Sequence, residues 1–185
     1  MILPIYAYGQ SILKKPGKLV AKDMDGLAVL IENMWDTMYN AKGIGLAAPQ
    51  IGKSLRLFLV DTIQIEDDEK KEFEGVKMAL INPTILEEEG EEEPYEEGCL
   101  SIPDIRGEVY RQPTIRIEYF DEEFTKNVKT FTGINARVIQ HEYDHIEGKL
   151  FTEKLKPLRK RLIKRKLESI KKGKINSNYR MRFAT

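Results

Sequence analysis

The sequence is poor in the features that mark secreted and membrane proteins. It has a single cysteine, Cys99, so an internal disulfide cannot form and a reducing compartment is expected. Its first residues lack the basic stretch and the apolar core of a secretory signal. No apolar run approaches the roughly 18 residues that a membrane-spanning helix requires. Together these absences predict a cytoplasmic protein.

The sequence also lacks net charge, but its charges are unevenly distributed. Lys and Arg number 30, and so do Asp and Glu. From Lys154 to Arg182 there are thirteen basic residues and one acid, Glu168, a balance of +12. The remaining residues hold 17 basic and 29 acidic side chains, a balance of −12. An acidic body with a basic tail indicates that only the tail seeks a polyanion.

The length of 185 residues, 41% of them hydrophobic, predicts one domain with a real core. We therefore expect a single domain over 1–185, in which about 154–185 form a basic C-terminal helix and tail. Helices are predicted at about 23–41, 133–147 and 157–172, each followed by a glycine suited to ending it. The apolar face of the last helix is predicted to contain Leu158, Leu162, Ile163, Leu167 and Ile170. The residues after Gly173 are expected to be frayed.

A strand-rich middle separates the first two helices. Strands are predicted at 55–60 and 114–119, with shorter candidates at 78–81, 84–86 and 127–131. A charged loop is expected at 66–74, and 87–97, with eight glutamates, is expected to be a solvated hairpin. The fold class is therefore α+β. We expect small antiparallel or mixed sheets packed around a central helix that carries a His-Glu-x-x-His motif, with a C-terminal helix beside them.

The strongest chemical signal is the segment Gln140-His-Glu-Tyr-Asp-His145. His141 and His145 are four residues apart, so on a helix both imidazoles project from one face and can bind one cation. Glu142, beside the first histidine, is placed to act as a general base on water. These are the only two histidines in the chain. The motif therefore predicts a catalytic metal site.

A catalytic metal usually takes three protein ligands, so the two histidines need a partner. Cys99, within Glu97-Gly-Cys-Leu-Ser101, is the obvious candidate. The alternative is a buried free thiol that behaves as a small hydrophobe. A third segment, Gly43-Ile-Gly-Leu-Ala-Ala-Pro-Gln50, has small residues that allow close backbone approach and an amide donor in Gln50. Taken alone, that segment is a tight turn with close packing.

Together these three segments resemble the motifs of the peptide deformylases, in the family's order and at comparable spacing. The resemblance implies a metal-dependent amidase that removes the formyl group from N-formylmethionine on nascent polypeptides and releases formate. It implies that Cys99, His141 and His145 bind one divalent metal ion. The family uses Fe(II) in the cell, and zinc, nickel or cobalt can occupy the site.

The resemblance also implies the other site residues. Glu142 takes the proton of the attacking water and delivers it to the departing amine, while the Gln50 side chain and the Leu100 backbone N–H stabilise the oxyanion. The residues expected to contact substrate are Ile44, Gly45, Glu97, Arg106 and Val138. For Asp144, a hydrogen bond to a metal ligand and a plain salt bridge are both open. Arg137 either edges the pocket mouth or is simply exposed.

The expected partners are formylmethionyl nascent peptides and, through the basic C-terminal helix, the ribosome near its tunnel exit. We expect counterion release to favour ribosomal RNA at this helix, and truncation after Pro157 to spare hydrolysis of a short peptide. Two alternatives remain. One is a zinc endopeptidase, which would usually draw its third ligand from further along the chain. The other is a non-catalytic ribosome-binding module with a structural metal, which would need a fourth protein ligand.

Overall fold

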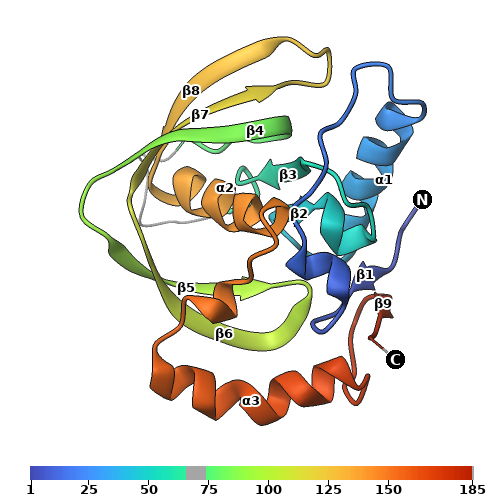
Figure 1. The fold of residues 1–185 in the computed structure, drawn as a ribbon, viewed down its shortest axis with the longest axis vertical. Helices are drawn as coiled ribbons and strands as arrows, with labels where there is room; N and C mark the ends of the chain where they lie inside the picture. The colour runs from blue at the N-terminus through green and yellow to red at the C-terminus, as the bar shows by residue number, and fades with distance from the viewer. Residues whose placement is uncertain (66–73, 185) are drawn as a thin grey trace.

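The computed structural model describes residues 1–65 and 74–184. Within them the chain forms an α+β fold with three α-helices and several small sheets (Figure 1). The helices are α1 (Leu27–Asn40), α2 (Gly133–Ile146) and α3 (Pro157–Lys171). The strands are β1 (Ile5–Tyr6), β2 (Gly45–Ala47), β3 (Leu57–Asp61), β4 (Lys77–Glu89), β5 (Glu93–Cys99), β6 (Ile102–Arg111), β7 (Thr114–Phe120), β8 (Lys126–Thr132) and β9 (Met181–Arg182). The charged loop predicted at 66–74 lies, apart from Glu74, outside the described residues.

The largest sheet has five antiparallel strands in the order β2-β3-β4-β7-β8. Side chains of β3 alternate between its two faces, as the pleat of a strand requires. Leu57 and Leu59 join the core cluster of α1, whereas Phe58 and Val60 join the cluster that contains Val138 of α2. All four are fully buried, so the sheet lies between these two helices.

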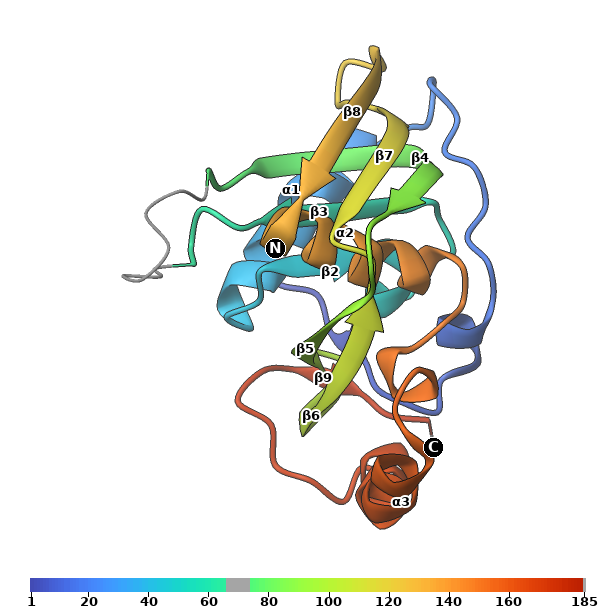
Figure 2. The same cartoon turned by 90° about the vertical axis from the view of Figure 1, so that its left-hand side faces the viewer.

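A separate antiparallel hairpin, β5–β6, covers the other side of α2. In two perpendicular views α2 lies between the five-stranded sheet and this hairpin (Figures 1 and 2). The third core cluster lies under the hairpin and includes Ile105 and Val109 of β6 with Ile163 and Ile170 of α3. The arrangement brings the end of β5, the edge strand β2 and one face of α2 close together.

The two short strands predicted at 78–81 and 84–86 form one strand, β4. Its register against β7 shifts between Ile81 and Thr84. Asn82 has a positive φ of 50°, and Pro83 has no N–H to donate, so the ladder is interrupted without ending the strand. The glutamates at 87–93 are exposed, as expected, but the predicted hairpin is wrong. The chain turns at Gly90, and then β5 pairs with β6 and not with β4.

The C-terminal segment differs most from expectation. Ile163 and Ile170 are buried, but Leu158 and Leu162 are 67% and 66% exposed, so the predicted apolar face is too wide. Because α3 packs mainly against β6, only a narrow stripe of the helix is covered. The tail is not frayed: β9 pairs in parallel with β1 near the start of the chain. Truncation after Pro157 would remove buried parts of the core, contrary to the expectation of a separable helix.

Candidate active site

The two histidines and the cysteine converge although they come from different elements. His141 and His145 lie one turn apart on α2, with ring centroids 5.1 Å apart, and Cys99 ends β5. One ligand atom from each of the three residues lies within 4.8 Å of the others. The Cys99 Sγ and His145 Nε2 atoms are 3.2 Å apart. A soft thiolate and two imidazoles at this spacing fit one divalent transition-metal ion.

Glu142 is buried beside these groups. Among the described residues its Oε2 atom has no hydrogen-bond partner, although it is shielded from solvent. Burial raises the pKa of Glu142 to about 7, and the charge of His141 opposes part of that rise. A carboxyl group with a pKa near neutrality and an unused oxygen can accept a proton and return it. Both properties come from its enclosure by α2 and β2.

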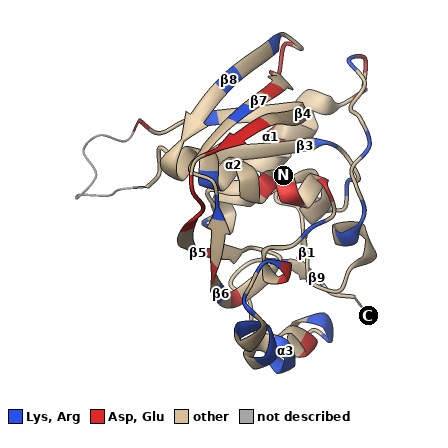
Figure 3. Cartoon of the chain, turned by 60° about the vertical axis from the view of Figure 1, so that its left-hand side comes forward, with Lys and Arg blue, Asp and Glu red and all other residues tan. Residues whose placement is uncertain are grey.

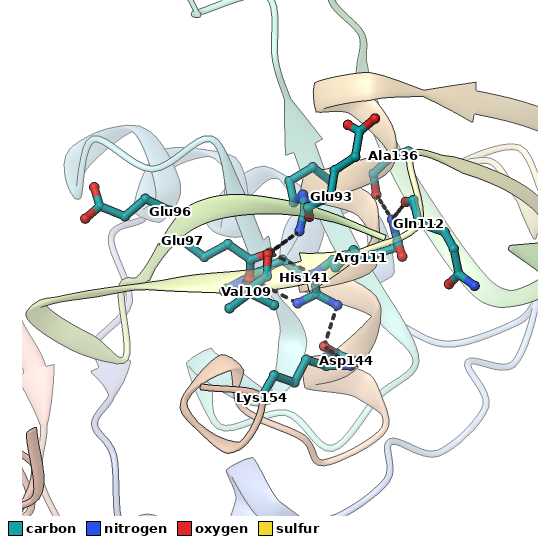
Figure 4. Close-up of polar contacts among 12 residues, drawn as sticks. Glu93, Glu96, Glu97, Val109, Arg111, Gln112, Ala136, His141, Asp144 and Lys154 are labelled. Carbon is teal, nitrogen blue, oxygen red and sulfur yellow. Dashed lines mark hydrogen bonds and ion pairs between the residues drawn. The ribbon is translucent and has the colours of Figure 1, made fainter. Parts of the chain in front are cut away.

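His141 is held by a buried ion network. Its Nδ1 lies 2.9 Å from Glu97 Oε2, and Arg111 donates to both oxygens of Glu97 at 2.7 and 3.0 Å (Figure 4). Burial by itself would lower the pKa of His141, but its contacts with Cys99 and Glu97 raise it. Burial would raise the pKa of Glu97, and the hydrogen bonds from His141 and Arg111 lower it overall. The network fixes the orientation of the imidazole.

Two side chains whose position the sequence left open also belong to this network. Asp144 accepts from Arg111 Nη1 at 2.8 Å, so it forms a salt bridge, and among the described residues its side chain makes no hydrogen bond to a histidine. Arg137 is buried, and it donates to Glu97 at 3.3 Å and to the carbonyl of Glu93 at 2.6 Å. Of the two interpretations of Arg137, the exposed arginine is therefore wrong, and the residue lines the pocket. Sequence reasoning missed Arg111, since nothing in its local pattern distinguishes it from a surface arginine.

The Gly43–Gln50 segment forms the opposite wall. Gly45 lies in β2, the edge strand of the five-stranded sheet. A Cβ atom at Gly45 would come within 2.8 Å of Glu142 Cδ, so the close approach of β2 to α2 requires glycine. Gln50 accepts a hydrogen bond from the Ala47 N–H at 2.8 Å. Its amide nitrogen lies 3.5 Å from Cys99 Sγ and thus faces the cluster.

A pocket of about 540 Å³ opens onto these groups. Every predicted site residue except His145 lines it, namely Ile44, Gly45, Gln50, Glu97, Cys99, Leu100, Arg106, Val138, His141 and Glu142. Both oxygens of Glu97 are engaged inside the protein, and Arg106 is tied at the rim to Glu96. Tyr179, which sequence reasoning assigned to a frayed tail, also lines the pocket.

Comparison with known proteins agrees with this geometry. Residues 2–161 match the family model described as polypeptide deformylase. The chain is 57% identical to a peptide deformylase of Christiangramia forsetii, over 99% of this chain and 96% of that protein. It is 52% identical to one of Flavobacterium johnsoniae, over 100% of this chain and 97% of that protein.

Solved structures give the same result. A peptide deformylase of Legionella pneumophila superposes with a TM-score of 0.81 at 38% identity, covering 94% of this chain and 98% of that one. A Met-Ala-Ser-bound deformylase of Acinetobacter baumannii has a TM-score of 0.76 at 33% identity, covering 84% and 99%. No helix in the described part of the chain is long and apolar enough to cross a membrane. The chain therefore belongs to the peptide deformylase family, the metal-dependent hydrolases that remove the N-formyl group from nascent polypeptides.

Proposed function

We propose that Cys99, His141 and His145 hold one divalent ion, Fe(II) in the cell, which zinc, nickel or cobalt can replace. The observation that carries this proposal is the convergence of the three ligand atoms within 4.8 Å. Three protein ligands leave a position open for water, and the mixed sulfur and nitrogen set suits several metals. When bound, such an ion supplies Lewis-acid chemistry that acidifies a water and polarises the formyl carbonyl.

Glu142 is the proton carrier in this proposal. Its raised pKa, and an Oε2 atom that has no hydrogen-bond partner in the described part of the chain, support the removal of a proton from the attacking water. The water oxygen adds to the formyl carbon, the bond from that carbon to the amide nitrogen breaks, and Glu142 passes the proton to the departing amine. Formate and a free N-terminal methionine result.

The Gln50 side-chain amide and the Leu100 backbone N–H stabilise the negative charge that develops on the formyl oxygen. Gln50 supports this role because its Oε1 is fixed by the Ala47 N–H, which turns the amide nitrogen toward Cys99. Leu100 follows Cys99 directly and lines the same pocket. Loss of one such donor typically costs about 10²–10³ in kcat.

The substrate binds as an extended peptide along the free edge of β2, through the backbone of Ile44 and Gly45. An edge strand offers unpaired N–H and C=O groups, which favour strand addition, but the Ile44 carbonyl already accepts a hydrogen bond from the Asp61 N–H at 2.8 Å. The Met-Ala-Ser bound to the Acinetobacter baumannii enzyme is consistent with a methionyl peptide as ligand. Val138 on α2 borders the methionine side chain, with Glu97 and Arg106 at the pocket wall and rim.

The chain acts as one deformylase domain over 1–185, in which the small sheets pack around α2. A single cysteine and a substrate made by ribosomes support a cytoplasmic location.

Anaerobically purified protein should contain about one iron per chain and release formate from a formyl-methionyl peptide. The unformylated peptide is the control, and its internal cleavage would favour an endopeptidase. Full activity with no transition metal bound would refute the metal site.

The basic helix α3 docks on ribosomal RNA near the tunnel exit. Lys and Arg gather along α3, whereas acids gather along β4 and β5 (Figure 3). Lys160, Arg161, Lys164 and Arg165 are all exposed. Since phosphate contacts weaken steeply with salt, pelleting with ribosomes should fall between about 50 and 200 mM salt.

The matched test of α3 is charge reversal without truncation. The double variant Arg161→Glu, Arg165→Glu should no longer pellet with ribosomes. It should still hydrolyse a short peptide, because neither residue lines the pocket. Reversal of Lys53 and Lys149, exposed on the body, is the control. Equal pelleting of both variants would refute docking through α3.

A further inference from the structure

The loop that carries Cys99 and Leu100 is hydrogen-bonded to residues near both ends of the chain. The hydroxyl of Tyr179 donates to the carbonyl of Leu100 at 2.7 Å. The N–H of Tyr8 donates to the carbonyl of Ser101 at 2.8 Å. Two consecutive carbonyl groups beside the cysteine are thus fixed by residues far away in the sequence.

The segment that carries Tyr179 is itself held firmly. In the parallel pair of β1 and β9, the N–H of Ile5 donates to the Arg180 carbonyl, and that of Ala7 to the Arg182 carbonyl, each at 2.9 Å. Beyond β9, the Gln10 side chain donates to the carbonyl of Phe183 at 2.5 Å. Tyr179 is therefore held in place, although it lies in the tail that follows the basic helix α3.

We propose that Tyr179 is a positioning residue for the Leu100 backbone amide. The inference rests on the proposed role of that N–H as an oxyanion donor. Peptide groups are planar, so the only free backbone rotations at Leu100 are its φ and ψ angles. A hydrogen bond that fixes the Leu100 carbonyl restricts both angles. These angles set the direction of the Leu100 N–H relative to that carbonyl. Tyr179 lines the pocket together with Leu100 and contacts it directly through the hydroxyl.

The test is Tyr179→Phe, which removes one hydroxyl and keeps the ring, which packs against the same core cluster as Leu100. Tyr6→Phe is the matched control, since the Tyr6 hydroxyl accepts a hydrogen bond from Arg182 in the same tail at 3.1 Å and does not touch Leu100. We expect kcat of Tyr179→Phe to fall about tenfold with KM unchanged, less than the roughly 10²–10³ lost on removing an oxyanion donor. Tyr6→Phe should keep the wild-type kcat.

A second measurement is independent of turnover. Amide hydrogen exchange in the peptide spanning 97–102 should be faster in Tyr179→Phe than in Tyr6→Phe at equal melting temperature, because local opening of the loop is easier. If Tyr179→Phe melts early, the exchange comparison is made at a lower temperature where both variants are folded. Unchanged exchange and unchanged kcat would overturn the proposal.

Gln50→Leu separates this inference from the proposed function. If Gln50→Leu loses activity and Tyr179→Phe does not, the oxyanion site stands and Tyr179 has no part in positioning it. If neither loses activity while the wild type releases formate, the oxyanion assignment itself fails. Equal loss of kcat in Tyr179→Phe and Tyr6→Phe would show a general effect of the tail and would also overturn the proposal.

Discussion

Gly45→Ala offers a sharp test of how β2 and α2 meet at the site. The new Cβ would lie 2.8 Å from Glu142 Cδ and 2.9 Å from Glu142 Cγ. Optimal contact between carbon atoms begins at about 3.5 Å, so the carboxyl group must retreat by about 0.7 Å. Misplacement of a catalytic group by about 1 Å can cost about 10²-fold. We therefore expect kcat/KM to fall by about 10²-fold.

The readouts for Gly45→Ala are formate release, metal content and melting temperature. Metal content should be unchanged, because Cys99 and the two histidines are not displaced. Gly98→Ala is the control at the same pocket, since its Cβ would meet only the flexible end of the Arg106 side chain at 3.1 Å. Wild-type activity in Gly45→Ala, with wild-type melting, would refute the close packing of Glu142 on β2.

A double-variant cycle identifies the cause. Glu142→Asp shortens the side chain that the new methyl group displaces. If the clash limits activity, the combined variant should lose less than the two single losses together. Strict additivity would mean that Gly45→Ala acts through substrate binding along β2 and not through Glu142.

Four further substitutions test the metal ligand, the base, the ion network and the packing of α3. Cys99→Ser should weaken metal retention or change the metal bound, because a soft thiolate becomes a harder oxygen ligand. Metal analysis of the purified variant measures this, and unchanged metal content would exclude Cys99 as a ligand. Glu142→Ala should keep the metal and lose about 10²–10⁴-fold in kcat, so normal formate release would show that Glu142 is not the base. Arg111→Met should lower the free energy of unfolding by about 3–5 kcal/mol in urea titration, because Glu97 and Asp144 both lose a buried cationic partner. A neutral effect would contradict the ion network. Ile163→Ala should lower the free energy of unfolding by about 2–5 kcal/mol in the same titration. Leu162→Ala, one residue earlier on the exposed side of α3, should change that free energy by less than about 0.5 kcal/mol.

The sequence predicted a candidate metal site because the pattern that indicates it is local. The spacing of His141 and His145 places both on one face of any helix, and Glu142 follows from the same short motif. The strands at 55–60 and 114–119 and the three helices were confirmed in position, within a few residues, because hydrophobic periodicity is also a local signal. The α+β class followed from those elements.

Other features depended on contacts between distant parts of the chain, and only the tertiary structure decided them. Arg137 and Glu97 are charged residues of types that are usually exposed. Both are buried here because Glu97 pairs with Arg111 and with Arg137, which lies 40 positions away. The tail is ordered because β1 offers it a partner strand, and Tyr179 meets Leu100 across 79 positions. Local patterns determine which residues can form a helix or bind a metal. Burial and pairing depend on what the rest of the chain brings alongside, so short motifs predict candidate ligands and only the fold decides which residues surround them.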